Sequence, residues 1–214
     1  MDVGRFIQYI ASGTAYTVSV TLVALPLGLL IGLVFALLYV YGGKLSARVM
    51  SVYSTVMRGI PPIVLLFILY FTVSGNVNLS PLWAGSISLG IVSSAYQMEI
   101  IRGALLSVSG GQMMAARAIG LSKMGAIQHV IIPQAFRMAI TPWSNEAAIV
   151  IKDSSLVYAL GVPEILRRAQ LISASTQQPF LAFITAGFIY FILVFITNRL
   201  FDALDKRLRI PAHP

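Results

Sequence analysis

The polar residues best placed to do chemistry are two carboxylates in one largely apolar stretch. Glu146 stands in the middle of residues 136–153, and Asp153 follows seven positions later, near the same face of a helix. Asn145 precedes Glu146, whereas the nearest basic residue, Lys152, is six positions away. A buried carboxylate without a local cation favours binding of a positively charged group. We expect Asn145, Glu146 and Asp153 to bind the ammonium or guanidinium group of a solute, the alternative being a purely structural Glu146.

A second group of charges stands where two other apolar stretches end. Glu99 precedes Arg102 by three positions, the spacing of an ion pair on one helix, and Arg58 stands shortly before Pro61 and Pro62. We favour a structural ion pair of Glu99 with Arg102 or Arg58. The alternative is an inner gate of Arg58, Pro61, Glu99 and Arg102. The two prolines remove backbone donors, which is harmless at a helix start but leaves free carbonyls along a path; we favour the helix start.

Other chemistry has little support in the sequence. Cysteine is absent, and the two histidines, His129 and His213, stand too far apart in sequence to suggest a zinc site. The phosphate-binding pattern Gly-x-x-x-x-Gly-Lys-Ser/Thr is missing, so ATP must be bound elsewhere if it is used. We expect no metal and no cofactor on this chain. A small membrane enzyme using Glu99, Glu146 or Asp153 as acid or base remains a rival, although no nucleophile with a base supports it.

The elements that position these residues are membrane helices. Hydrophobic residues make up 57% of the 214 and charged residues only 10%, against about 25% in soluble domains, and the mean hydropathy is +0.85. Uncharged stretches run over 6–43, 59–98 and 169–198, each long enough to cross a bilayer. Alternating barrel strands are absent, so the prediction is an all-α integral membrane protein with one domain, residues 1–214.

The pattern predicts about five transmembrane helices, which places the two termini on opposite sides. The polar turn 74–81 divides one long uncharged stretch into two spans. The first stretch is too long for a cleaved signal and is expected to stay as an anchor. The expected spans are 14–41, 57–74, 82–104, 136–153 and 179–203.

The basic residues predict the orientation. The chain carries 15 Lys and Arg against 7 Asp and Glu, a net charge of +8, and these residues gather between the spans. The side with more of them is expected to be cytoplasmic, which puts the N-terminus outside and the C-terminus inside. The expected inner residues are Lys44, Arg48, Arg58, Arg102, Arg117, Lys123, Arg137, Arg199, Lys206, Arg207 and Arg209, and the outer ones are Arg5, Lys152, Arg167 and Arg168. No basic run is interleaved with aromatics, so we expect no nucleic-acid partner.

The cytoplasmic loop 110–135 is too polar to span a membrane and too apolar for a solvated linker. A helix is predicted over 112–119 with a stop at Gly120, and Ser122 is placed to cap a second short helix that ends before Pro133. That second helix carries an apolar stripe with polar neighbours. It suits the groove of a soluble partner, or alternatively the lipid interface. The stripe is Met124, Ile127 and Ile131, flanked by Lys123, Gln128 and His129.

This loop resembles the signature of the permease subunits of binding-protein-dependent ABC importers, within the polar amino-acid branch. That signature is Glu-Ala-Ala, three residues, Gly, nine residues, Ile, any residue, Leu, Pro. Met114 stands in place of its Glu, whereas the glycine and proline positions are kept. The matching residues are Ala115, Ala116, Gly120, Val130, Ile132 and Pro133, and further similar stretches are 58–62, 95–96, 99–103 and 152–156.

The resemblance implies the type I ABC importer permease fold and a set of partners. These are a second permease subunit, two cytoplasmic ATPases that bind ATP and Mg, an external solute-binding protein and an amino-acid substrate, with the permease in the lipid of the cell (inner) membrane. Residues 122–130 resemble the coupling helix that lies in the ATPase groove. The residues assigned to ATPase coupling are Met114, Ala115, Ala116, Gly120, Ser122, Lys123, Met124, Ile127, His129 and Pro133.

The substrate class is suggested by a shorter resemblance. Residues 143–146, Trp-Ser-Asn-Glu, resemble the branch that imports histidine, lysine and arginine. We therefore expect a cationic amino acid, the alternatives being glutamine, glutamate or another polar amino acid. A structural scaffold would explain the spans but not the loop. Gly28 and Gly32 have the spacing of close helix packing.

Overall fold

The computed structural model describes residues 2–74, 79–108 and 110–208, and these ranges contain helices and no strands. Residues 75–78 of the predicted turn 74–81, together with Arg209 and His213, lie outside them. The helices are α1 (Val3–Ala11), α2 (Thr14–Tyr41), α3 (Lys44–Gly59), α4 (Pro62–Ser74), α5 (Pro81–Ser107), α6 (Gly110–Ala118), α7 (Lys123–Ala126), the π-helical turn η1 (Ile127–Ile131), α8 (Ile132–Asp153), the 3-10 turn η2 (Ser154–Leu160), α9 (Ile165–Thr176) and α10 (Pro179–Leu208).

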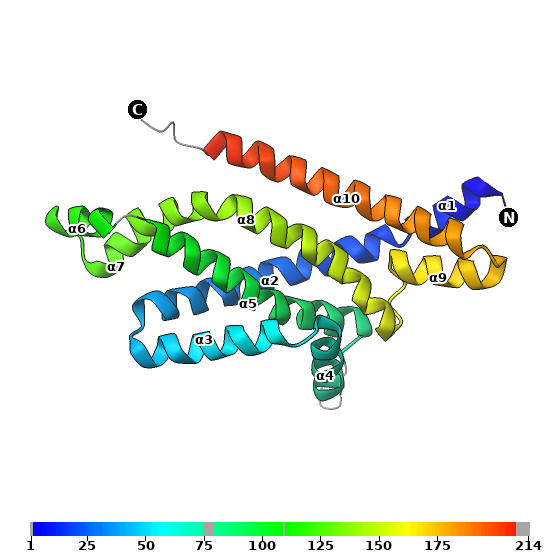
Figure 1. The fold of residues 1–214 in the computed structure, drawn as a ribbon, viewed down its shortest axis with the longest axis horizontal. Helices are drawn as coiled ribbons and strands as arrows, with labels where there is room; N and C mark the ends of the chain where they lie inside the picture. The colour runs from blue at the N-terminus through cyan, green and yellow to red at the C-terminus, as the bar shows by residue number, and fades with distance from the viewer. Residues whose placement is uncertain (1, 75–78, 109, 209–214) are drawn as a thin grey trace.

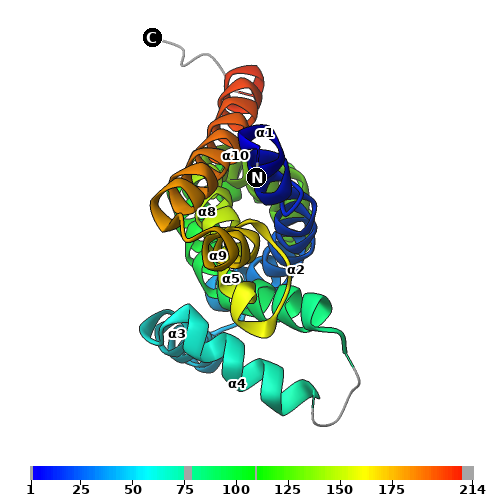
Figure 2. The same ribbon diagram turned by 90° about the vertical axis from the view of Figure 1, so that its right-hand side faces the viewer.

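The long helices lie along one axis of an elongated molecule (Figure 1). Helix α2 packs on α5, α5 on α8, and α8 on α10. The short helices α1 and α9 lie at one end, and α6 and α7 lie at the opposite end. Viewed along the long axis, α3 and α4 form a separate group on one side of the others (Figure 2).

Helices α2 and α5 approach each other closely because α2 has glycines on its contact face. A Cβ on Gly28 would lie 2.5 Å from Gln97 Nε2, and one on Gly32 would lie 2.8 Å from the Met98 backbone nitrogen. Side chains at these positions would therefore push the helices apart. The packing predicted from the spacing of Gly28 and Gly32 is confirmed.

The predicted span 57–74 is two helices instead of one. Helices α3 and α4 meet at a bend of 106°. Ile60 is extended, with φ −104° and ψ 135°, as expected before a proline, and α4 starts at Pro62. Pro61 and Pro62 thus stand at a helix start, the favoured interpretation, but the start is five residues later than predicted.

Length and composition support fewer spans than five. Among the described residues, Val3–Tyr41 and Pro179–Leu208 are long and apolar enough to cross a membrane, and the bent pair α3–α4 makes a third candidate. Helices α5 and α8 do not pass because they carry many small and polar residues. Several of these, such as Ser88, Ser93 and Gln97, are buried inside the protein. The five spans and their orientation therefore stay predictions.

Candidate functional site

Glu146 lies on the side of α8 that faces α5. Its side chain is only 3% exposed, and Ser93 Oγ on α5 donates to Glu146 Oε1 at 2.6 Å. Glu146 and Asp153 border one hollow between these helices, together with Ser93 and Tyr96. Its accessible space is about 10 Å³, enough for about one water molecule. The structure thus brings together two of the three predicted substrate residues.

Asn145 lies apart from this hollow. Its side chain is exposed and is not among the residues that line the space around Glu146. Consecutive residues of a helix point about 100° apart, so Asn145 and Glu146 face different surroundings. The prediction grouped the two residues because they are adjacent in the sequence, but their side chains lie on different faces of the helix.

The sequence analysis missed three polar residues on α5. Ser93 and Tyr96 line the hollow. Gln97 does not line it, but its Nε2 donates to Ser93 Oγ. Ser93 and Gln97 stand four positions apart in a stretch without charges, which places them on one face of a helix. That spacing is the available signal in the sequence, and it is a weak one because serine is common in membrane helices.

A group of polar and charged residues, Ser54, Glu99 and Arg102, connects α3 and α5. Arg102 pairs with Glu99 Oε2 at 2.7 Å, and Ser54 Oγ donates to Glu99 Oε1 at 2.7 Å. The structural ion pair of Glu99 with Arg102 is confirmed. Arg58 instead lies over the ring of Tyr96, with 6.0 Å between the guanidinium carbon and the ring centre. Tyr96 also lines the hollow, so it lies between Arg58 and the space beside Glu146.

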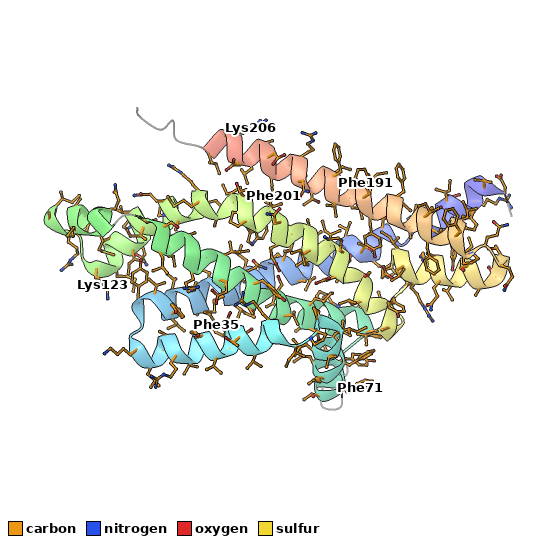
Figure 3. All side chains as sticks on the ribbon, in the orientation of Figure 1. Phe35, Phe71, Lys123, Phe191, Phe201 and Lys206 are labelled. Carbon is orange, nitrogen blue, oxygen red and sulfur yellow. The ribbon has the colours of Figure 1, made fainter. Side chains whose placement is uncertain are left out.

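The start of the coupling segment is as predicted. Gly120 adopts φ +92°, a conformation that suits glycine after a helix end. Ser122 caps α7, with its Oγ accepting from the Gly125 backbone N–H at 3.0 Å. Lys123 lies at the same end of the molecule as α6 (Figure 3), with its Nζ 5.9 Å from the ring centre of Tyr41.

The predicted apolar stripe of this segment is only partly available to a partner. Ile127 and Ile131 are buried, at 5% and 3% exposure, because this part of the chain packs on α6 and α5. Met124 is 61% exposed, and two other large apolar side chains, Met114 and Ile119, are also exposed. We call these three residues the apolar tip. Ser122, Lys123 and His129 are exposed nearby, as is Ala115, whereas Ala116 is buried.

The prediction that the second loop helix ends before Pro133 is wrong. Helix α7 continues through η1 into α8, with right-handed helical dihedral angles at Ile127 and Ile132. Pro133 stands in the first turn of α8. Proline lacks an N–H, and the wider π-helical turn just before it changes the hydrogen-bond spacing where that donor is missing. Met124 of the apolar tip and Glu146 are therefore joined by one continuous helical element.

Comparison with known proteins identifies the family. The model of the family described as "binding-protein-dependent transport system inner membrane component" matches residues 9–210. The chain belongs to this family. The family predicted from the loop signature is confirmed, and this inner membrane component is a part of a transport system.

Individual relatives of this inner membrane component agree with the assignment. The octopine transport system permease protein OccQ of Agrobacterium tumefaciens is 31% identical over 207 residues, covering 91% of this chain and 87% of the relative. The L-cystine transport system permease protein TcyB of Bacillus subtilis is 35% identical over 205 residues, covering 95% and 88%. A crystal structure of an amino acid ABC transporter with histidines matches with a TM-score of 0.85 and 32% identity, covering 97% of this chain and 99% of that one.

Proposed function

We propose that this chain is the permease subunit of an ABC importer for amino acids with a positively charged side chain. The observation that carries the proposal is the hollow with two carboxylates, Glu146 and Asp153. Within the described residues, neither carboxylate makes an ion pair within 4 Å. A cationic group would need the hollow to widen, and between the two carboxylates it would then gain two charge-assisted interactions.

The relatives support the solute class at a coarser level. Their names refer to octopine, L-cystine and an amino acid ABC transporter with histidines. Transport of an amino acid is the common element of the last two names. The preference for a cation comes from the two carboxylates of this chain and not from those names.

The proposed energy source lies in partner subunits. The sequence has no phosphate-binding loop, so two separate ATPases would bind ATP and Mg. The apolar tip would dock on them, since exposed large apolar side chains at one end of the molecule suit the groove of a soluble partner. A second permease subunit would complete the path, and an external binding protein would deliver the solute. Neither a metal ion nor a cofactor on this chain has a part in the proposal.

The proposed coupling is mechanical. Closure of the ATPases on ATP would move α7, and this movement would pass through η1 along α8 to Glu146. ATP would act only through its preference for one of two conformations. Arg58 and Tyr96 would form part of an inner gate, because Arg58 contacts the ring that lines the hollow.

The experiment is uptake of labelled arginine into proteoliposomes that hold the permease, its ATPase and its binding protein. ATP-dependent uptake that unlabelled lysine or histidine competes away supports the proposal. Glu146→Gln is expected to reduce arginine uptake at least about tenfold, since a charge-assisted interaction is lost. Asp202→Asn removes an exposed acid on α10 and serves as the matched control, with uptake unchanged.

Three results would contradict the proposal in different ways. Selective uptake of glutamine would keep the importer and reject the cationic solute. Full arginine uptake by Glu146→Gln would remove Glu146 from the site. A complex that hydrolyses ATP without taking up any amino acid would reject the solute class.

A further inference from the structure

Gln97 is a neutral polar residue buried where α2, α5 and α8 meet. Its side chain is 0% exposed, and Gly28 on α2 leaves the space that it fills. Its Nε2 donates to Ser93 Oγ at 3.0 Å and to the Leu25 carbonyl at 3.2 Å. Its Oε1 accepts from Trp143 Nε1 at 2.6 Å. The amide is thus held by groups on three helices.

These neighbours determine which way the amide of Gln97 faces. An indole N–H can only donate, so the amide oxygen must face Trp143. A backbone carbonyl can only accept, so the amide nitrogen must face Leu25. The reversed amide would place two donors together at Trp143 and two acceptors together at Leu25. Only one orientation satisfies both neighbours.

The orientation of Gln97 sets the direction of the bonds that follow. Ser93 Oγ accepts from Gln97 and has a single proton, which it donates to Glu146 Oε1 at 2.6 Å. Each bond from Trp143 to Glu146 therefore donates toward the carboxylate. Burial alone disfavours an ionised carboxylate, whereas a hydrogen bond donated to it favours the ionised form.

We infer that Gln97 is a positioning residue that keeps Glu146 ionised through Ser93, and so sets the preference of the hollow for a cationic over a neutral solute of similar shape. The inference rests on the proposed function and adds a residue that does not line the hollow. The other titratable groups facing Glu146 across the hollow are Asp153 on α8 and Tyr96 on α5.

The test measures binding of labelled arginine and of citrulline, its uncharged analogue of similar shape. The protein is the purified permease–ATPase complex without binding protein, so the selectivity belongs to the permease. The test variants are Gln97→Leu, Trp143→Phe and Ser93→Ala. Trp143 borders an apolar groove lined by α2, α5, α8 and α10 and not the hollow, so a merely structural role would leave the preference for arginine unchanged.

Two controls match these variants. Phe201→Leu changes the ring that packs against Trp143, with ring centres 5.1 Å apart, but keeps the indole N–H. Ser86→Ala removes a buried serine of α5 whose hydroxyl, within the described residues, donates to the Leu82 carbonyl of its own helix. Ser93→Thr keeps the hydroxyl and is the conservative variant for rescue.

The ratio of arginine to citrulline affinity is expected to fall about tenfold in Gln97→Leu, because without Gln97 the Ser93 hydroxyl is no longer held as a donor to the Glu146 carboxylate. The fall is expected to be smaller in Trp143→Phe, since the Leu25 carbonyl still orients the amide. Ser93→Ala should match Gln97→Leu and gives the same test if the buried Leu variant does not assemble. The ratio should stay at the wild-type value in both controls and in Ser93→Thr.

The two levels of the proposal fail separately. Wild-type preference for arginine, with an unchanged ratio in Trp143→Phe and Ser93→Ala, overturns the role of Gln97 and leaves the cationic solute standing. A wild-type complex that binds citrulline as well as arginine overturns the cationic preference itself, and the inference with it. An equal fall in Phe201→Leu also overturns the inference, because loss of packing would then explain the effect.

Discussion

Glu146 and Glu164 are both buried carboxylates, but their surroundings differ. Glu164, at 0% exposure, caps α9 and accepts from the backbone N–H groups of Leu166 at 2.8 Å and Arg167 at 2.6 Å, and from the Tyr190 hydroxyl. Burial raises the pKa of Glu164, and these three bonds act against the rise. Glu146 has one bond, from Ser93, and borders a hollow.

The two glutamates differ in whether both of their carboxylate oxygens accept hydrogen bonds. The oxygens of Glu164 are occupied by groups that the fold must satisfy anyway, since the first N–H groups of a helix have no partner within it. Glu146 keeps one oxygen without a partner in the described structure. Burial alone therefore does not distinguish these two acids, whereas the number of hydrogen bonds that each accepts within the described residues does.

The largest expected effect is a difference in stability between variants of the two glutamates. Glu164→Ala should destabilise the protein by about 3 kcal/mol, because a helix cap and the partner of a buried hydroxyl are lost together. Glu146→Leu should leave the melting temperature unchanged or raise it, because an incompletely bonded buried charge is removed. The measurements are thermal unfolding and arginine binding of the purified complex. The comparison breaks if Glu146→Leu lowers the melting temperature as much as Glu164→Ala does.

A smaller change at the same site sharpens the comparison. Tyr190→Phe removes one of the three donors to Glu164 and keeps both backbone donors. The expected loss is about 1–2 kcal/mol of stability, typical of a hydrogen bond to a charged group. Its measure is the melting temperature, with the preference for arginine over citrulline unchanged. A change in that preference would show that the two buried acids are coupled.

The sequence predicted the parts of this fold that depend on neighbours along the chain. Helix α2 has the predicted bounds 14–41, and the cap at Ser122 and the packing of Gly28 and Gly32 are as expected. Periodicity, capping and small-residue spacing are local signals, so one sequence suffices to read them.

The parts that failed depend on contacts between distant segments. Ile127 has the spacing of a docking residue, but it is buried, and η1 packs on α6. Gln97 and Glu164 accept hydrogen bonds from Trp143 and Tyr190, which stand 46 and 26 positions away. Glu164 was overlooked because it follows a proline in a loop and glutamate is not among the preferred caps. The hydrogen-bond partners of these residues could not be read without the tertiary structure.

Glu99 offers an intermediate case, with a partner for each oxygen and a basic residue left over. Arg58 contributes no ion pair within 4 Å and lies over Tyr96. Arg58→Gln is expected to change the ATP hydrolysed per solute carried by a factor of about three, roughly 0.7 kcal/mol, while the complex still assembles. The control is Arg48→Gln, an exposed residue of the same helix α3. Unchanged coupling in Arg58→Gln would leave Arg58 a structural residue.

The smallest expected effect concerns the second helix cap, Ser122, which does at the surface what Glu164 does in the interior. Ser122 is exposed, so water can satisfy the N–H of Gly125 when the side chain is removed. Ser122→Ala should therefore cost only about 0.5–1 kcal/mol, at the low end of the range for a lost cap.

The measurement is the ATPase retained by the purified permease, because a frayed α7 presents Met124 less often. Affinity for the ATPase should fall two- to fivefold by the same free energy. Ser122→Asp should restore it, since aspartate caps as well as serine does. If Ser122→Ala loses as much stability as Glu164→Ala, exposure does not distinguish the two caps. The comparison of Glu164, whose oxygens are both bonded, with Glu146, which borders a hollow, then loses its physical basis.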